Sequence, residues 1–468
     1  MTVTLVTLNP ETREIIDGDN VNDLVASWKE QLQKDAGNTG VLCDKIVLEG
    51  KSYTPEAAKI IADFLTSTDD YKPSIASGIK VAIIADIIAS QMEAEALNVL
   101  TTISNAFQES RLEEVDLSDN AMGTKGVVAC KTVLSGPSVI KTLQRLKLCN
   151  NGLSQYTMDE VAVLLTEGES SCIAKNLTQI HFFNNMSDDD GCKSFKKIIA
   201  RSENLDDIRF SGTRAKAEGS AFIASGLKDL AESGNLSNVT RLDLADNSFG
   251  DCYEDLAEAL RVCPKLVYLD IHDCCLGDDG ITAVCDALLE AKPSLSYLSI
   301  SGNGIGEDSY EGAKSVAKLI GSLNQSLESF NASENELKSP GIRAIVRAFR
   351  SNTVKEIYLN QNEVGTVGAN ELIDMASRVP NLEVIELDEN GFVSDVVDKL
   401  TSTFGDKLAE MEDTNDNEDY DDILDPEDLN DDLGVPTEQD ETNEDETNPA
   451  PDDADVHSLT KLFNQQTL

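Results

Sequence analysis

The sequence predicts an α/β solenoid, a curved stack in which short parallel strands alternate with helices. An apolar frame, L-x-x-L-x-L-x-x-N-x-L with substitutions, recurs along the chain, and in six copies a glycine follows the asparagine position by six residues. From Asn120 to Asn390 the frame advances nine times in 270 residues, a period of 30. This period and this frame are those of a leucine-rich repeat at the long end of its range.

The asparagine of the frame has a physical cause. Alternating apolar residues make a short strand with one buried face, after which the chain turns inward. An asparagine at that turn can pair backbone groups that leave the strand ladder and would otherwise be buried without a partner. In two copies Thr213 and Cys274 occupy this position, where their side chains pair backbone groups less well than asparagine does. We predict a structural turn role for Asn120, Asn151, Asn185, Asn247 and Asn303.

The segments between frames predict helices on the outside of the curve. Residues 124–136, for example, carry apolar side chains at the spacing of a helix face. Neither a strand nor a helix can bury its apolar face alone, so successive repeats must stack. Parallel strands lie about 4.8 Å apart and packed helices roughly 10 Å apart, so the strands line the inside. We expect a ribonuclease-inhibitor-like horseshoe that meets partners on its concave face or on its strand-to-helix rim.

Weaker copies of the frame extend the array toward the N-terminus. One has Lys51 at the asparagine position, and the next has Ile87 there. We count about twelve repeats over residues 42–405. Residues 1–41 contain a short apolar alternation and an amphipathic stretch, and we expect them to cap the open N-terminal end of the solenoid.

The charge of the chain is strongly negative, at -47. Residues 406–455 hold 23 Asp or Glu and one Lys, which is a net charge of -22, and residues 1–405 carry -26. The first of these segments has few apolar residues and repels itself, so we expect a disordered acidic tail. Residues 456–468 have apolar side chains at helical spacing, and either a short helix or a frayed end fits them. An acidic chain disfavours nucleic acid and favours a basic protein partner.

A search for catalytic or metal-binding motifs finds little. The chain has no phosphate-binding glycine loop, no HExxH and no CxxC. "SDDDG" at 187–191 and "GDDG" at 277–280 resemble calcium loops, but both follow a frame turn, where carboxylates favour the start of a helix. No apolar run is long enough to span a membrane. We therefore expect an intracellular binding protein with no active site of its own, no cofactor and no metal.

Several irregular repeats resemble one family. They are "SYTPEAAKIIADFL", "EAEALNVLTTISNAFQESRLEEVDLSDNAMGTKG", "LQRLKLCNNGLS", "LTQIHFFNNMSDDDG" and "FSGTRAKAEG", and an acidic tail follows the last repeat. Together they resemble the Ran GTPase-activating proteins, most closely the plant forms. The resemblance implies binding of the GTP-bound Ran GTPase and stimulation of its GTP hydrolysis, in support of nucleocytoplasmic transport. In this family the rim loops bind the GTPase switch regions and help the GTPase to place its own glutamine against the attacking water.

The resemblance also implies which residues contact the GTPase. In "LCNNGL" the family's turn asparagine corresponds to Asn150 or Asn151, and we favour Asn150 because the frame position Asn151 is expected to be structural. By the same reasoning Asp119 and Asn184, each beside a frame asparagine, are surface groups. The loop that begins at Asp86 is expected to face the GTPase as well, with Asp86 and Gln91 as contact residues.

This loop departs from the family pattern. Family members carry D-x-x-x-G-R there, whereas Ser90 and Gln91 stand where glycine and arginine are expected, and neither Lys nor Arg lies between Lys80 and Arg111. Three interpretations are open: an activator that uses another cation, a slower activator, or a Ran-binding homologue without activation. A leucine-rich-repeat scaffold or inhibitor unrelated to GTP hydrolysis is the alternative from another class.

The expected partners and location depend on the same resemblance. We expect a monomer that binds a Ran-type GTPase, and a basic Ran-binding or transport factor is a further candidate partner. The segments that flank the repeats match neither the nuclear-envelope-targeting domain of plant forms nor the C-terminal helical domain of animal forms. We therefore expect a cytoplasmic protein, with the nuclear periphery as the alternative.

Overall fold

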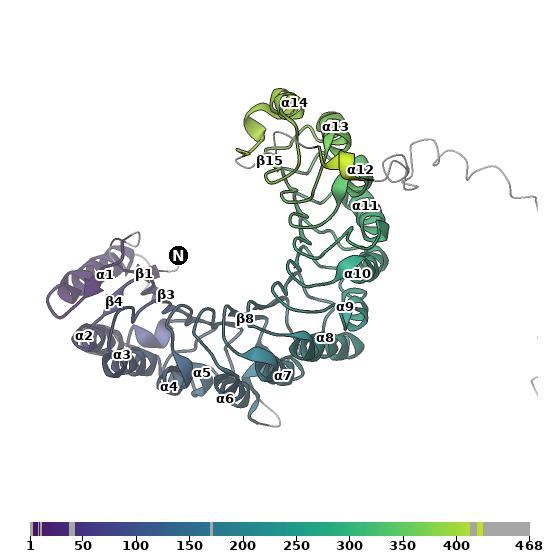
Figure 1. The fold of residues 1–468 in the computed structure, drawn as a ribbon. Coiled ribbons are helices and arrows are strands. Elements are labelled where there is room, and N and C mark those ends of the chain that lie inside the picture. Colours follow the sequence, from purple (N-terminus) through teal and green to yellow (C-terminus); the bar gives the residue numbers. More distant parts are fainter. Residues whose placement is uncertain are drawn as a thin grey trace, which may run out of the picture.

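The computed structural model describes residues 3–7, 9, 12–36, 43–168, 172–411 and 419–424. They form an open arc with strands along its inner side and helices along its outer side (Figure 1). The predicted fold class, a leucine-rich-repeat horseshoe, is confirmed. Each frame supplies a strand, and each segment between frames supplies the helical part of its repeat.

The inner side of the arc is one parallel sheet of 13 strands, which follow one another in chain order. These strands are β1 (Val3–Val6), β3 (Cys43–Val47), β5 (Val81–Ile83), β6 (Glu114–Asp116), β7 (Arg145–Lys147), β8 (Gln179–Phe183), β9 (Asp207–Ser211), β10 (Arg241–Asp243), β11 (Tyr268–Asp270), β12 (Tyr297–Ser299), β13 (Ser329–Asn331), β14 (Glu356–Tyr358) and β15 (Val384–Glu386). Strands β3 and β5 to β15 lie within residues 42–405, and β1 lies ahead of them. The separate strands β2 (Ile15–Ile16) and β4 (Ser52–Tyr53) pair with each other in parallel.

The outer side is a row of helices. They are α1 (Val21–Ala36), α2 (Pro55–Thr66), α3 (Glu93–Ala106), α4 (Gly123–Ala129), α5 (Lys131–Ser135), α6 (Gln155–Thr166), α7 (Asp188–Ile199), α8 (Ala217–Glu232), α9 (Tyr253–Leu260), α10 (Gly277–Ala291), α11 (Glu311–Leu323), α12 (Lys338–Ala348), α13 (Thr366–Met375) and α14 (Ser394–Phe404). Short 3-10 turns are η1 (Ala76–Gly78), η2 (Ile173–Asn176), η3 (Ala376–Arg378), η4 (Gly405–Lys407) and η5 (Tyr420–Ile423). The helix expected over 124–136 is divided into α4 and α5 at Cys130.

The N-terminal segment extends the solenoid. Strand β1 pairs in parallel with β3, so it adds a thirteenth strand ahead of the twelve repeats. Helix α1 packs beside it, and the indole nitrogen of Trp28 donates to the carbonyl of Val6 at 2.8 Å. Trp28 and Leu24 are fully buried. The segment expected to cap the array thus contributes a strand and a helix of its own.

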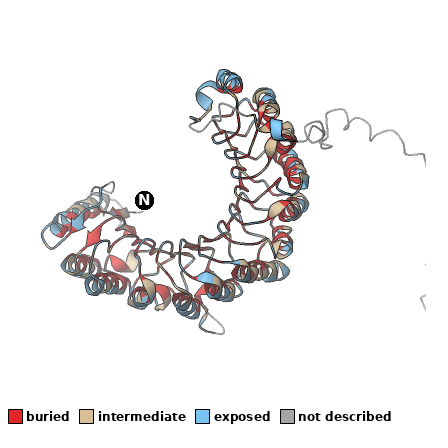
Figure 2. Ribbon diagram, viewed as in Figure 1, coloured by how far each residue is buried: buried red, intermediate tan, exposed pale blue. Residues whose placement is uncertain are grey.

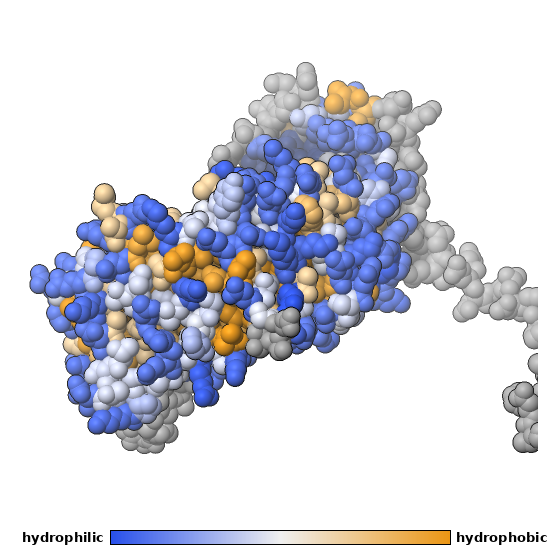
Figure 3. All heavy atoms as spheres, turned by 90° about the horizontal axis from the view of Figure 1, so that it is seen from below, coloured by the Kyte–Doolittle hydropathy of each residue, from blue (hydrophilic) through white to orange (hydrophobic). Residues whose placement is uncertain are grey.

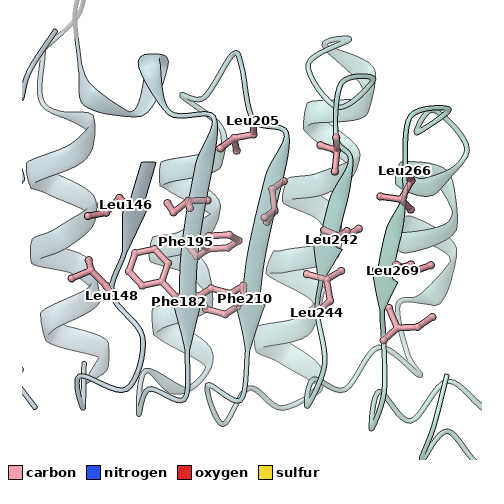
Figure 4. Packing of buried hydrophobic residues seen from close by; sticks show 14 of the residues in the cluster. Leu146, Leu148, Phe182, Phe195, Leu205, Phe210, Leu242, Leu244, Leu266 and Leu269 are labelled. Atoms are coloured by element: carbon pink, nitrogen blue, oxygen red, sulfur yellow. The ribbon is translucent and has the colours of Figure 1, made fainter. Parts of the chain in front are cut away.

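The hydrophobic core lies between the sheet and the helices (Figure 2). Figure 4 shows the frame residues of successive strands pointing toward the helices, with Phe182, Phe195 and Phe210 packed together. The rings of Phe195 and Phe210 stack with centroids 4.2 Å apart. Each such burial contributes roughly 1.5–3 kcal/mol. All ten cysteines are unpaired, and seven of them are buried. The face of the molecule seen in Figure 3 is mainly hydrophilic.

Buried asparagines link the turns of neighbouring repeats. The Nδ2 of Asn151 donates to the carbonyl of Leu117 at 3.0 Å, and its Oδ1 accepts the backbone N–H of Asn120 at 3.0 Å. The Oδ1 of Asn185 in turn accepts the N–H groups of Asn151 and Leu153, both at 3.1 Å. The bond from Nδ2 to a carbonyl of the preceding repeat recurs at Asn247, Asn303, Asn335, Asn362 and Asn390. These side chains pair backbone groups that no strand or helix satisfies.

Carboxylates at the starts of α7 and α10 bind the next helix along the chain. The Oδ1 of Asp189 accepts the N–H groups of Lys216 at 2.8 Å and Gly219 at 3.0 Å, at the start of α8. Asp278 accepts the N–H of Gly312 at 3.1 Å, at the start of α11. These aspartates belong to the two segments that resemble calcium loops, and here they satisfy free N–H groups at a positive helix end.

A segment beyond the last repeat uses the same chemistry. The Oδ1 of Asp419 accepts the N–H of Thr366 at 2.9 Å, and the Oδ2 of Asp421 accepts the N–H of Val367 at 2.6 Å, in the first turn of α13. Asp421 is buried, and this burial is the main cause of its raised pKa. The segment 419–424 therefore caps a helix that belongs to an earlier repeat.

These residues fall in the stretch 406–455 that the sequence predicts to be disordered. Residues 419–424 are placed against α12 and α13, and η4 directly follows α14. The rest of the predicted acidic tail and the helix expected at 456–468 lie outside the described residues. The low apolar content of residues 406–455 therefore does not reveal which of their carboxylates accept N–H groups at the start of a helix.

The asparagine bonds lead to a test of stability. Asn151→Ala leaves the N–H of Asn120 buried without a partner and removes one of the two amide groups that donate to the carbonyl of Leu117. It should lower the free energy of unfolding by about 1–3 kcal/mol. Urea unfolding followed by circular dichroism measures the change. Asn150→Gly, at the exposed neighbouring position, is the matched control and should change this free energy by less than about 1 kcal/mol. Equal losses for the two variants would contradict the structural role of the asparagine.

Candidate functional site

In each repeat, the residue directly before the asparagine position of the frame has a left-handed backbone. Its φ lies between 50° and 75° in all twelve repeats. We call these residues the rim row: Gly50, Asp86, Asp119, Asn150, Asn184, Gly212, Asp246, Asp273, Gly302, Glu334, Gln361 and Glu389. Glycine, asparagine and aspartate tolerate this conformation best, which explains most of the row. Six members are carboxylates and none is basic, so the row is an acidic edge.

Four predicted contact residues lie side by side in the rim row. Asp86, Asp119, Asn150 and Asn184 follow β5, β6, β7 and β8, which are neighbours in the sheet. The Nδ2 of Asn150 donates to the Oδ1 of Asp119 at 2.8 Å, and the Nδ2 of Asn184 donates to the Oδ1 of Asn150 at 3.0 Å. Asp119, Asn150 and Asn184 are exposed. These bonds hold three polar side chains in one arrangement before any partner binds.

Gln91, the fifth predicted contact residue, is oriented differently. Its Nε2 donates to the carbonyl of Tyr53 and to the Oγ of Ser52, the latter at 3.3 Å. Ser52 also donates to the carbonyl of Ala89 at 2.5 Å. The amide of Gln91 therefore joins its loop to the preceding repeat and is not directed outward. Contact between Gln91 and a partner stays a prediction, and such contact would require the side chain to leave these bonds.

Arg13, a cation that the sequence did not indicate, lies at the N-terminal end of the rim row, beside Asp86. The guanidinium of Arg13 pairs with the carboxylate of Asp86, across 73 positions of the chain. The Arg13 side chain is 63% exposed and that of Asp86 is 18% exposed. The hydrogen bond to Asp86 and then its charge raise the pKa of Arg13, and Asp119 adds to this. No local pattern in the sequence links these two segments.

A second surface, on the concave face, combines arginines with aromatic rings. We call Phe183, Arg209, Arg241, Tyr268 and Tyr297 the concave strip. The guanidinium of Arg209 lies 3.8 Å from the ring centroid of Phe183, and that of Arg241 lies 3.6 Å from that of Tyr268. The rings of Tyr268 and Tyr297 are parallel within 3° and 4.2 Å apart. Sequence reasoning missed this surface, although aromatic residues at outward-facing strand positions were a usable signal.

A buried carboxylate holds the two arginines of the concave strip. The Oδ2 of Asp243 lies 2.9 Å from the Nε of Arg209 and 3.2 Å from the Nη2 of Arg241. Burial raises the pKa of Asp243, while the charge of Arg209 opposes this rise. Both arginine side chains are about 30% exposed, so each presents one side to solvent and the other to its carboxylate or ring. Stacked arginines and tyrosines of this kind are common at the centre of protein interfaces.

His272 lies next to this strip and carries a proton at neutral pH. Its Nδ1 bonds the Oδ1 of Asp270 at 2.7 Å. This bond, followed by the charges of Asp270, Asp246 and Asp273, raises the pKa of His272 to about 9. Ligand atoms of Asp246, His272 and Asp273 lie within 4.8 Å of one another. A metal ion needs an unprotonated ring nitrogen, so this group behaves as a set of ion pairs at neutral pH.

Comparison with known proteins gives two matches to one family model. The model described as "Leucine Rich repeat" matches residues 111–129 and 262–285. With the frame and the parallel sheet, these matches decide the class. The chain is a leucine-rich-repeat protein. In the described part of this leucine-rich-repeat protein, every helix is too short or too polar to cross a membrane.

Individual relatives of this leucine-rich-repeat protein include proteins named as Ran GTPase-activating proteins and as ribonuclease inhibitors, and also a NACHT, LRR and PYD domains-containing protein. RAN GTPase-activating protein 1 of Arabidopsis thaliana is 33% identical over 99 residues, 21% of this chain and 17% of the relative. Ran GTPase-activating protein 1 of Xenopus laevis is 30% identical over 167 residues, 34% of this chain and 27% of the relative. The ribonuclease inhibitor of Mus musculus is 24% identical over 284 residues, 58% of this chain and 56% of the relative. The chain thus spans less than two thirds of each.

Among solved structures, the "Crystal structure of Rad7 and Elc1 complex in yeast" contains a similar chain. The similarity covers 84% of this chain and 88% of that chain, with 14% identity and a TM-score of 0.40.

The protonated His272 provides a pH test. Because its folded pKa of about 9 lies above the ordinary value of 6.5, its contribution to stability is fully present below pH 6.5 and is lost as the pH rises through about 9. A titration of the ring by NMR should give the raised pKa directly. The free energy of unfolding of the unaltered chain should fall over this range relative to that of His272→Gln. A ring that titrates near 6.5 would contradict the ion-pair arrangement.

Proposed function

We propose that this chain binds the GTP-bound form of a Ran-type small GTPase and stimulates its GTP hydrolysis. The observation that carries the proposal is the run of polar side chains at Asp86, Asp119, Asn150 and Asn184, on consecutive repeats of one rim. The partial similarity to proteins named as Ran GTPase-activating proteins supports the identity of the partner.

The proposed mechanism is one of positioning. The GTPase supplies the catalytic groups, and the rim supplies amide and carboxylate groups that are already oriented by bonds to each other. Such groups lose little conformational freedom on binding, so they can hold the catalytic glutamine of the GTPase in a productive position. The chain contributes no nucleophile or base to the reaction.

Charge should guide the encounter. The rim row carries six carboxylates and no basic residue, and the chain has a net charge of -47. A field of this sign attracts a basic partner surface over distances near the Debye length, about 8 Å at physiological salt. A basic Ran-binding or transport factor is a second partner of the proposed assembly. The proposed location is the cytoplasm, with the nuclear periphery as the alternative.

A specific interaction also favours an alternative function. The concave strip has the stacked arginine and tyrosine side chains of an interface centre. A partner that occupies the concave face need not approach the rim at all. The alternative is therefore an interaction scaffold or inhibitor, which includes a protein that binds the GTPase without changing its hydrolysis rate.

Single-turnover GTP hydrolysis by a Ran-type GTPase, with and without the chain, tests the proposed function. The chain should raise the rate, and Asn150→Gly should reduce the stimulated rate about tenfold to a hundredfold because it removes a contact worth about 1.5–3 kcal/mol. Glycine keeps the left-handed backbone of this position. Gln361→Gly, the same backbone state at the other end of the arc, is the control and should change nothing. Hydrolysis at the same rate with and without the chain would refute the proposal.

The alternative makes a different prediction for binding. If the GTPase sits on the concave strip, Tyr268→Ala should weaken its affinity at least about tenfold, because truncation removes the stack with Arg241 and Tyr297. Asn150→Gly should then leave the affinity unchanged. Isothermal titration calorimetry with the GTP-bound GTPase measures both. The rim proposal expects the reverse order of effects.

A further inference from the structure

Asn9 and Thr12, which precede β2, are bonded to the first repeats by a buried lysine. Lys51 occupies the frame position, and its side chain is fully buried. Its ammonium donates to the carbonyl of Asn9 at 2.8 Å and to the carbonyl of Thr12. The carboxylate of Glu14 lies 3.8 Å away and compensates the buried charge. An asparagine is too short to make these bonds, so the substitution at the frame position serves the N-terminal loop.

The other end of this loop is bound to the same repeat. The N–H of Ser52 donates to the carbonyl of Glu14 at 3.0 Å, and the N–H of Thr54 donates to the carbonyl of Ile16 at 2.8 Å. These bonds belong to the parallel pairing of β2 with β4. Arg13 therefore lies between two anchored residues, Thr12 and Glu14, and its backbone position is determined by the repeat to which they are bonded.

The surroundings of Arg13 explain why a cation is stable there. Its guanidinium pairs with Asp86, and Asp119 is close enough to raise its pKa. Glu49 lies in the same region, and its pKa is raised first by burial and then by the charges of Asp116, Asp119 and Asp86. A strong negative potential thus exists at this end of the rim row, and a positive group reduces it.

From this geometry we infer that Arg13 is the cationic contact that the rim offers to an anionic group of the GTP-bound partner. The inference rests on the proposed function. An acidic rim alone would repel the phosphates of a bound nucleotide and the carboxylates around them. A guanidinium has five N–H donors, and pairing with one carboxylate leaves several of them available. With 63% of its side chain exposed, Arg13 can bind a second anion while Asp86 keeps it in place.

This assignment resolves the departure at Ser90 and Gln91. The cation missing from that loop is supplied from a segment 73 positions away from Asp86, so the chain corresponds to an activator that uses another cation. A guanidinium held by Asp86 can orient an anionic side chain of the bound GTPase, which agrees with the proposed positioning mechanism.

Single-turnover hydrolysis at saturating concentrations of the full chain tests the inference. Arg13→Ala should reduce the stimulated rate about tenfold to a hundredfold. Arg13→Lys keeps the charge but loses the planar guanidinium, so its stimulated rate should lie between that of Arg13→Ala and that of the unaltered chain. Arg111→Ala removes another exposed arginine and has the same effect on net charge, so it is the matched control and should leave the rate unchanged. The thermal midpoint should be the same for all variants, since Arg13 is mostly exposed.

The possible outcomes separate the inference from the proposed function. Stimulation by the unaltered chain together with equal stimulation by Arg13→Ala overturns the inference and leaves the function standing. A loss in Arg111→Ala equal to that in Arg13→Ala also overturns it, because net charge would then be the cause. If the unaltered chain does not stimulate hydrolysis, both fail. A salt titration adds a second readout: the stimulated rate should depend less on ionic strength in Arg13→Ala than in the unaltered chain.

Discussion

The turn from strand to helix is the constraint on which the whole molecule depends. There the backbone leaves the parallel sheet inside a dry core, and its N–H and C=O groups must find partners without water. A buried asparagine such as Asn120 pairs groups in its own turn and in the preceding repeat. The tight turn that allows this forces the residue before it into a left-handed backbone. Stability and the exposed rim row therefore have one cause.

This shared cause explains how much of the site could be predicted from the sequence. Once a period of 30 is recognised, equivalent positions of successive repeats must lie in rows, because parallel strands in register place them side by side. Asp119, Asn150 and Asn184 could be grouped for that reason alone. The left-handed backbone of the row was not predicted, although its preference for aspartate, asparagine and glycine was visible in the sequence.

Contacts between distant segments could not be predicted in this way. Arg13 contacts Asp86 because Lys51 holds Asn9 and Thr12 against the first repeats, and neither the period nor the frame contains that information. Gln91 could be assigned to a loop, but its side-chain direction depends on a bond to Tyr53 in the preceding repeat. The concave strip likewise depends on the register that places Tyr268 beside Tyr297. The repeat pattern therefore predicts which residues occupy equivalent positions in successive repeats. It does not predict the side-chain contacts that link one segment to another.

The capping of α13 by Asp419 and Asp421 determines where the chain leaves the solenoid. After α14 the polypeptide returns to α12 and α13, so residue 424 does not lie at the open end of the arc. Residues 419–424 are thereby held beside the first turn of α13, on the same edge as the rim row. The 3-10 turn η5 thus adds carboxylates to an edge of the solenoid that is already acidic.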